Sequence, residues 1–364
     1  MLIMKFIDEY RNSEIVMDLA NKIKAINHKE ISLMEVCGGH TMAIHRFGIP
    51  SLLPDNVKLI SGPGCPVCVS GIEFIDKAIA LSNREDVIIT TYGDLIRVPG
   101  SKSSLEKEKS MGDDVRIVYS ALDALEIAKQ NKDKKIVFLG IGFETTTPGT
   151  AVVIQQSYKE KISNLYLLSA HKIMPPVMEA LLKEKVKIDG FICPGHVSTI
   201  TGSKIYDFIP EKYKIACVVT GFEPTDIMQS VYMLAKQINE QDQKVEIQYS
   251  RVVTREGNIK AQVIMNEVFE TRTDNWRGIG EITNSGLKLR EKYKAFDAEL
   301  VFDIQIDPVE EHSACICGQI LRGQKAPKDC KLFGMVCSPD NPIGACMVSS
   351  EGACQAFYKY RKYE

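Results

Sequence analysis

The stretch KIVFLGIGFETTTPG, residues 135–149, decides the fold class. Its first half is a run of Ile, Val, Phe and Leu, which is typical of a strand covered on both faces. The run ends in Gly142-Phe143-Glu144-Thr145, a glycine-containing loop that leads into the next helix. Strand, loop and helix in this order form the unit from which parallel α/β sheets are built.

The same unit recurs from about residue 31 to residue 270. Mostly Val, Ile, Leu and Phe fill eight predicted strands, at residues 31–36, 57–60, 87–91, 135–141, 164–169, 189–192, 215–220 and 245–249. Between them lie helical patterns. Ile72, Ile75 and Ile79 share one helix face, and Pro224 opens a helix that runs through Met233. The sequence therefore predicts an α/β fold with parallel sheets.

Two pairs of loops resemble each other, which suggests two similar α/β lobes. Gly62-Pro63-Gly64-Cys65 and Gly142-Phe143-Glu144-Thr145 recur in altered form as Cys193-Pro194-Gly195-His196 and Gly221-Phe222-Glu223-Pro224. From about Asp307 the pattern dissolves into Cys, Gly and Pro. We expect an N-terminal segment at 1–50 that carries Cys37 and packs with the C-terminal region. The lobes are expected at 51–150 and 151–255, and a helical, Cys-rich region at 256–364.

Composition excludes several classes of protein. Among 364 residues, 45 Lys and Arg nearly balance 47 Asp and Glu, so the chain lacks the basic field of a nucleic-acid binder. No run approaches eighteen apolar residues, and no secretion signal opens the chain, so we expect a cytoplasmic protein without a membrane span. Eleven cysteines in such a chain indicate metal ligation or thiol redox chemistry rather than a disulfide scaffold.

Unusual short motifs follow directly after seven of the predicted strands. They contain Cys37, Gly62 to Cys65, Tyr92 to Asp94, Glu144, His171, His196 and Glu223. Open α/β sheets bind ligands at the carboxyl ends of their strands, so these loops are predicted to share one cleft. The alternative is that such loops need Gly and Pro for their turns, which explains the glycines but not the Cys, His and Glu beside them.

Two cysteine motifs near the front carry candidate chemistry. Cys37-Gly38-Gly39-His40 puts a thiol at a helix start, where the helix dipole favours the thiolate that binds metals. His40 could orient the sulfur or donate a hydrogen bond to whatever the sulfur holds. A tight turn is the alternative. Cys65 and Cys68 have the C-x-x-C spacing of a redox pair, and half of a zinc site is the competing interpretation.

Six further cysteines lie within the last fifty residues. Four of them suit a [4Fe–4S] cluster, in which each iron takes one sulfur, and these are Cys330, Cys337, Cys346 and Cys354. Zinc held by four cysteines is the alternative. Cys315 and Cys317 are ambiguous, because either sulfur could replace one of the four or the pair could be a separate redox element.

Acidic and histidine residues beside these motifs are weaker candidates. Glu144 and Glu223 could relay protons at a cleft, although a glutamate at a helix start is more often a cap. His171 and His196 follow strands directly and are candidates for lining the site, with a histidine held by neighbouring backbone as the alternative.

Taken in order, five motifs resemble the hydrogenase maturation factor HypD family. They are Glu-Val-Cys37-Gly-Gly-His-Thr, Ser-Gly-Pro-Gly-Cys65-Pro-Val-Cys68-Val, Gly-Ile-Gly-Phe-Glu144-Thr-Thr, Cys193-Pro-Gly-His196-Val and Ala-Cys346-Met-Val-Ser-Ser-Glu351-Gly-Ala-Cys354. The resemblance implies two Rossmann-like lobes and a [4Fe–4S] region. It also implies a scaffold for the Fe(CN)2CO unit of [NiFe] hydrogenases that works with a small HypC-type partner. Cyanide would arrive from a HypE-type carrier, and the unit would pass to the hydrogenase large subunit.

The same resemblance implies roles for individual residues. Cys37 would bind iron beside His40, with His196 and Glu351 in support, and Cys65 and Cys68 would be the redox pair. The implied cluster ligands are Cys330, Cys337, Cys346 and Cys354. Electrons would enter at the cluster, pass to the redox pair and support ligand transfer to the iron at Cys37. The rival functions are a stand-alone electron-transfer protein or disulfide reductase, and a zinc-stabilised binding module.

Overall fold

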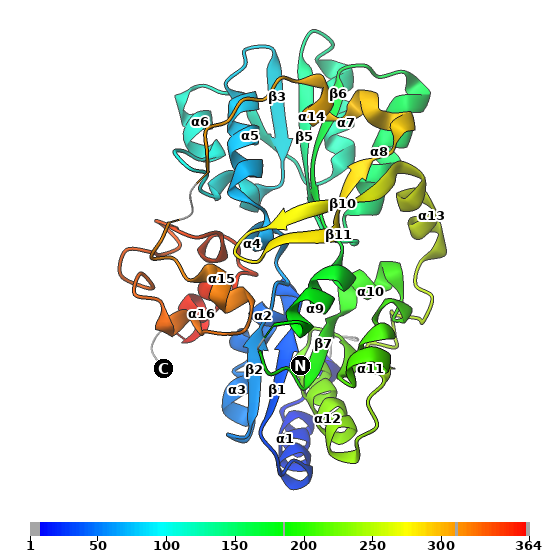
Figure 1. Cartoon of the computed structure of the whole chain (residues 1–364), viewed down its shortest axis with the longest axis vertical. Coiled ribbons are helices and arrows are strands. Elements are labelled where there is room, and N and C mark those ends of the chain that lie inside the picture. Colours follow the sequence, from blue (N-terminus) through cyan, green and yellow to red (C-terminus); the bar gives the residue numbers. More distant parts are fainter. Residues whose placement is uncertain (1–7, 185, 310–311, 362–364) are drawn as a thin grey trace.

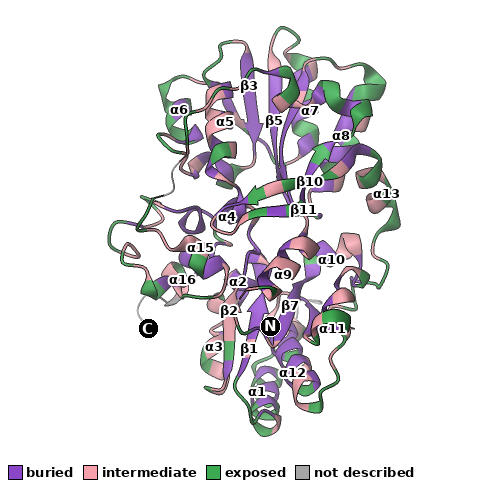
Figure 2. Cartoon of the chain, viewed as in Figure 1, coloured by how far each residue is buried: buried purple, intermediate pink, exposed green. Residues whose placement is uncertain are grey.

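All eight predicted strands form, and they divide between two parallel sheets (Figure 1). The computed structural model describes residues 8–184, 186–309 and 312–361. The predicted α/β class is therefore confirmed. The inner strands lie buried between helices as their apolar runs require, whereas the edge strands at 57–61 and 245–247 are mostly only partly buried (Figure 2).

The larger sheet joins strands from two distant parts of the chain. In spatial order they are β2 (Val57–Ser61), β1 (Ile31–Glu35), β7 (Gly190–Pro194), β8 (Ala216–Thr220) and β9 (Val245–Ile247). β1 pairs with β7 through Leu33 and Gly190. The helices that accompany these strands are α1 (Ser13–Ile26), α2 (Gly38–Arg46), α3 (Ile49–Leu52), α9 (Met174–Leu182), α10 (Gly195–Thr201), α11 (Phe208–Tyr213) and α12 (Pro224–Glu240).

The smaller sheet is built from one continuous part of the chain. Its spatial order is β4 (Val115–Ile117), β3 (Val87–Thr91), β5 (Lys135–Gly142) and β6 (Leu165–His171). Its helices are α4 (Pro66–Val69), α5 (Ile72–Ser82), α6 (Leu105–Met111), α7 (Ala121–Gln130), α8 (Thr147–Glu160), α13 (Ile259–Val268) and α14 (Ala298–Val301). The edge strand β4 was not predicted. It has only three residues, of which one is fully buried, so its sequence shows almost no hydrophobic pattern.

Sheet membership differs from the contiguous lobes expected at 51–150 and 151–255. β1 and β2 lie in the larger sheet with β7, β8 and β9, so the smaller-sheet lobe is inserted between two parts of the other. The Cys37 segment is therefore not a separate unit, although α2 does pack against the C-terminal helix α16 (Ala353–Arg361). Residues 1–7 of the expected N-terminal segment lie outside the described residues.

An antiparallel hairpin lies between the two sheets in Figure 1, where the sequence predicted helical and Cys-rich structure. β10 (Phe269–Trp276) and β11 (Gly280–Leu289) form it, and β11 packs against β6. The prediction was wrong here because β10 alternates exposed and partly buried residues, so it lacks the continuous apolar run of the other strands.

The C-terminal region carries only short elements, as its Cys, Gly and Pro content predicts. They are α15 (Cys317–Leu321), η5 (Pro327–Asp329), η6 (Ala345–Met347) and α16, and they gather beside α2 and α4 (Figure 1). Four further 3-10 turns complete the described chain: η1 (Asp8–Tyr10), η2 (Gly93–Arg97), η3 (Lys204–Tyr206) and η4 (Glu291–Phe296). Within the described ranges, no helix combines the length and apolar character that crossing a bilayer requires.

The core of the larger sheet gives the first testable prediction. Phe191 on β7 is 0% exposed, so Phe191→Ala should lower the free energy of unfolding by about 3–5 kcal/mol through lost burial and a cavity. Chemical denaturation followed by circular dichroism measures this. Tyr119→Ala is the control, because that ring is 95% exposed and its loss should change the free energy by less than about 0.5 kcal/mol. Equal effects of the two variants would contradict the described core.

Candidate functional site

The carboxyl ends of both sheets face the middle of the molecule, so the loops that follow the strands meet there (Figure 1). They form two separate groups of reactive side chains rather than one cleft. The first group surrounds Cys37, and the second is a set of thiols that includes Cys65 and Cys68.

The Cys37 loop is locked to the loop that follows β2. Cys37 is in extended conformation at the start of α2, and the next amide, on Gly38, donates to the Gly64 carbonyl at 2.9 Å. A Cβ on Gly64 would lie 2.1 Å from the Cys37 nitrogen, so only glycine permits this approach. The Glu35 carboxyl also holds the loop, because it accepts hydrogen bonds from the Cys37 amide at 3.1 Å and from the Thr41 hydroxyl at 2.7 Å.

Burial decides the protonation of Cys37. Desolvation, aided by the carboxylate of Glu351, raises the pKa of Cys37 to about 12, although the amides of His40 and Gly39 act in the opposite direction. The expectation that the helix start would favour a thiolate is therefore wrong for the free protein, because desolvation outweighs the amides. A bound metal ion reverses this, since a coordinating thiol loses its proton.

The His40 side chain ties the Cys37 loop to the loop after β8. Its Nε2 lies 3.1 Å from the Thr220 carbonyl oxygen and 3.0 Å from that of Gly221. Burial lowers the pKa of His40 to about 4, so the ring is neutral and Nε2 carries the proton that it donates. The ring stacks on Phe222 with centroids 4.6 Å apart, and His196 stacks on the same ring at 3.9 Å.

Glu351 reaches the Cys37 loop from the C-terminal region. A Cβ on Gly38 would lie 2.5 Å from the Glu351 Cβ, so the two residues are in close contact. Burial raises the pKa of Glu351, and the nearby carboxylate of Asp94 raises it further. Asp94 accepts from the Ser349 hydroxyl at 2.9 Å and thereby ties η2 to the turn that carries Glu351.

The second group is a chain of thiols that crosses from α4 to the C-terminal region. The Cys65 sulfur accepts from the Cys68 amide at 3.2 Å, and the Cys68 side chain reaches the Cys346 sulfur. Cys346 lies between Cys317 and Cys68, and its interactions with both thiols lower the pKa of Cys346 to about 6. The Cys68 thiol also donates to the Ala345 carbonyl at 3.9 Å. Cys317 in turn contacts Cys354 and Cys315.

Three of the four predicted cluster ligands, Cys337, Cys346 and Cys354, join this chain. Cys337 lies near Cys317 and Cys315, whose charges add to the effect of burial in raising its pKa. Cys330 is partly buried at the end of η5, and its carbonyl accepts from Phe333, which bridges to Cys337. The contacts that gather the other sulfurs do not include the Cys330 thiol.

Cys315 and Cys317, which the sequence left open, lie inside the thiol group. A Cβ on Gly344 would stand 2.6 Å from the Cys317 sulfur and 2.8 Å from that of Cys315, so both press against glycine backbone. Their one-residue spacing and the following glycine were the available signal. Within the described ranges, no three His, Cys, Asp or Glu side chains are already set for a single metal ion. A donor set made only of thiols, spread over several contacts, suits a cluster whose irons each take one sulfur.

The remaining candidates lie away from both groups. Glu144 is buried and accepts from the first amide of α9, on Met174, at 3.0 Å. His171 lies buried between Thr150 and Ser169, and burial lowers its pKa to about 3. Glu223 begins α12 as its cap and pairs with Arg11, so it acts as a helix cap, the more common role of such a glutamate.

Comparisons with known proteins match nearly the whole chain. The family model named HypD and described as "Hydrogenase formation hypA family" matches residues 14–361. The chain belongs to the HypD family. Hydrogenase maturation factor HypD2 of Bradyrhizobium diazoefficiens is 48% identical over 371 residues, covering 99% of this chain and 98% of that protein. HypD of Azotobacter vinelandii is 48% identical (98% and 97% covered), and HypD of Cupriavidus necator is 46% identical (99% and 98%).

Glu144 gives this HypD-family chain a pH-dependent stability. Burial raises the pKa of Glu144 to about 7 from its ordinary value of 4.5, so the folded state holds the proton more tightly than the unfolded state. The contribution of Glu144 to the free energy of unfolding should therefore be fully present below about pH 4.5. That free energy should fall by about 3 kcal/mol as the pH rises through 7.

Glu144→Gln should remove that part of the fall, because an amide has no proton to lose. Denaturation at pH 5 and pH 8 measures the difference for both proteins. The same loss of stability between the two pH values in Glu144→Gln and in the parent would show that Glu144 does not carry it.

Proposed function

We propose that this chain is a cytoplasmic hydrogenase maturation protein, an iron–sulfur scaffold that assembles and carries the Fe(CN)2CO unit with a small HypC-type partner. One observation carries the proposal: the Cys37 thiol is locked in a glycine-lined loop, and a chain of further thiols runs from α4 to the C-terminal region. The printed names of the relatives, hydrogenase maturation factors, support it.

Cys37 is the proposed ligand of the iron cargo. Its thiol is protonated at rest, so iron binding releases a proton and leaves a thiolate on the metal. Gly38 and Gly39 allow Glu351 and Phe222 to pack closely on the loop, because a Cβ on Gly38 would lie 2.5 Å from Glu351 and one on Gly39 would lie 3.0 Å from Phe222. A cysteine of the partner is proposed to share the iron. Glu351 and His196 flank the loop and are proposed to hold the cyanide and CO ligands in place or move protons near them.

The thiol chain is the proposed source of reducing equivalents. Cys65 and Cys68 act as a dithiol pair that supports acceptance of cyanide from a HypE-type carrier, before the unit passes to the hydrogenase large subunit. Cys330, Cys337, Cys346 and Cys354 are proposed to hold a [4Fe–4S] cluster, which supplies single electrons when bound. Cys315 is an alternative to Cys346, because Cys346 already contacts Cys68 and Cys317.

A second candidate, a stand-alone disulfide reductase, is favoured by the thiol chain alone. It has no use for the Cys37 loop, whose glycines and Glu35 clamp would then serve only a turn. Such a reductase would turn over small disulfides without a partner protein, whereas the scaffold would not.

Cys37→Ala tests the scaffold directly. Anaerobic co-production with the small partner should give infrared bands of cyanide and CO bound to iron in the parent, and their complete loss in Cys37→Ala. Iron, sulfide and the cluster absorption should be unchanged in the variant, because Cys37 lies outside the thiol group.

The matched control is Cys193→Ala, which removes a buried thiol of β7 whose side-chain contacts are with Cys217 and the Phe191 carbonyl, and which should keep the bands. Bands that persist in Cys37→Ala would exclude Cys37 as the ligand. A parent that binds four irons but shows no bands would favour the reductase.

A further inference from the structure

The tip of the β10–β11 hairpin holds the helix that carries the dithiol pair. The Arg277 amide donates to the Val69 carbonyl at 2.9 Å, and Trp276 forms an antiparallel bridge with Ser70. The Ser70 hydroxyl also donates to the Pro66 carbonyl at 2.9 Å. α4 is only four residues long, far below the length at which a helix is stable alone, so these contacts at its end define its shape.

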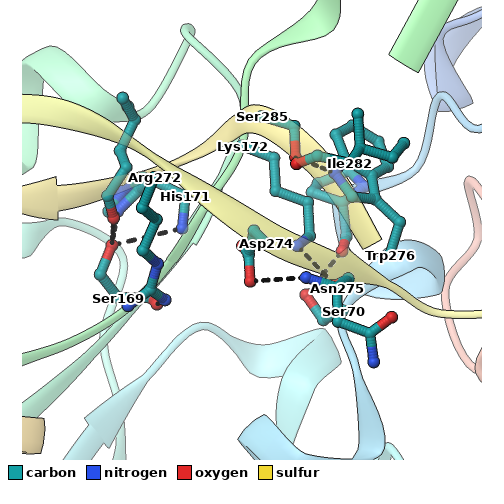
Figure 3. A network of polar contacts seen from close by, with 12 residues as sticks. Ser70, Ser169, His171, Lys172, Arg272, Asp274, Asn275, Trp276, Ile282 and Ser285 are labelled. Carbon is teal, nitrogen blue, oxygen red and sulfur yellow. Dashed lines mark hydrogen bonds and ion pairs between the residues drawn. The ribbon is translucent and has the colours of Figure 1, made fainter. Parts of the chain in front are cut away.

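Trp276 is the buried anchor of this hairpin tip. The ring is 0% exposed and its Nε1 donates to the Ser285 hydroxyl at 2.8 Å, which itself donates to the Ile282 carbonyl at 2.7 Å (Figure 3). Phe143, from the loop after β5, stacks on the indole with centroids 5.9 Å apart. The Lys172 ammonium lies 5.2 Å from the centre of the same ring.

A buried ion pair fastens the hairpin to the end of β6. The Lys172 ammonium donates to Asp274 at 2.7 Å and to the Asn275 carbonyl at 2.9 Å (Figure 3). The Lys172 amide donates to the Gly142 carbonyl at 3.0 Å, so the ends of β5 and β6 share the anchor. Two residues before Asp274 on β10, Arg272 donates to the Ser169 carbonyl of β6 at 2.8 Å. These contacts fix the hairpin to the smaller sheet at one end and to α4 at its tip.

A hydrogen bond at the start of α4 favours the reduced form of the pair. Cys65 stands in extended conformation at the N-cap of α4, and its sulfur accepts from the Cys68 amide at 3.2 Å. An amide that donates to a cysteine sulfur stabilises the thiolate, and a stabilised reduced form makes the disulfide more oxidising. The contacts that hold α4 in shape therefore keep this hydrogen bond in place.

We propose that Trp276 is a positioning residue for the Cys65–Cys68 pair: by bracing α4 it keeps the pair in the dithiol form and so makes its disulfide more oxidising. The inference rests on the redox role of this pair in the proposed function. In the reaction at issue, oxidised glutathione accepts two electrons and two protons from the two thiols. It leaves one intramolecular disulfide and two molecules of reduced glutathione.

The test is the dithiol–disulfide equilibrium in glutathione buffers. The tryptic peptide at residues 59–77 contains both cysteines and no other, so alkylation and mass spectrometry read this pair alone. Trp276→Phe removes the indole N–H bond and loosens the tip. The equilibrium constant should shift about tenfold toward the disulfide, equivalent to about 30 mV. Ser285→Ala, which keeps the ring and removes its partner, should shift it in the same direction.

Tyr293→Phe is the matched control. Tyr293 is another buried aromatic residue, in the core of the smaller-sheet lobe and away from α4. The variant removes the hydrogen bond of 3.0 Å that its hydroxyl makes with Glu267. It should leave the equilibrium of the pair unchanged. A shift of the same size in Tyr293→Phe would assign the effect to general loosening and overturn the positioning role.

Fluorescence gives a second measurement that needs no change at the tip. Trp276 is the only tryptophan in the chain, so oxidation of the pair should change its emission in the parent and not in a Cys65→Ser/Cys68→Ser variant. If the equilibrium is unchanged in Trp276→Phe and Ser285→Ala, and the emission of Trp276 does not respond to oxidation, the positioning role of Trp276 is overturned. The redox role of the Cys65–Cys68 pair is not affected by that result. A parent pair that never closes in oxidised glutathione overturns both.

Discussion

The pairing of β1 with β7 is the interaction on which the rest of the structure depends. It joins Leu33 to Gly190, more than 150 residues apart, and the missing side chain of Gly190 makes room for Leu33 and Leu234, whose atoms come within 3.1 Å of where a Cβ would lie. Because the strands are parallel, the same register sets the Cys37 loop beside the loops after β7 and β8. The stack of His40, Phe222 and His196 exists only because those three loops end at one edge.

Burial acts on two cysteines of this chain with opposite results. Cys37 is partly buried beside a carboxylate and keeps its proton, whereas Cys346 is fully buried, contacts two neighbouring thiols and gives its proton up more readily. Desolvation disfavours a thiolate in both places, so the neighbours decide the outcome. A cationic metal can displace the proton of Cys37, while Cys346 is suited to exchange with Cys68. The two groups are thus chemically distinct before any cofactor is considered.

The sequence predicted what is local and missed what depends on distant partners. Runs covered on both faces, such as the one that becomes β5, identify themselves as strands whatever they pair with. Sheet membership is set by long-range register, so the insertion of one lobe into the other could not be read from strand order. Two features indicate the β10–β11 hairpin. The residues of β10 alternate between exposed and partly buried positions, and Gly278 has a φ of 73° at the turn. The contacts of Cys317 with Cys346 arise from tertiary folding alone, and spacing could not select them.

One short C-terminal segment connects the two reactive groups. Within nine residues, Cys346 contacts Cys68, Ser349 binds Asp94, Glu351 presses on Gly38, and Cys354 meets Cys317. A displacement of the Cys346 sulfur must therefore move the backbone that carries Glu351, since both ends of the turn are buried and interiors are close-packed. The proposed electron supply and the proposed iron binding therefore need not share a residue to influence each other. The turn itself is the physical link, and its glycine at Gly352, where a Cβ would lie 2.3 Å from the Cys346 carbonyl oxygen, is what lets it close so tightly.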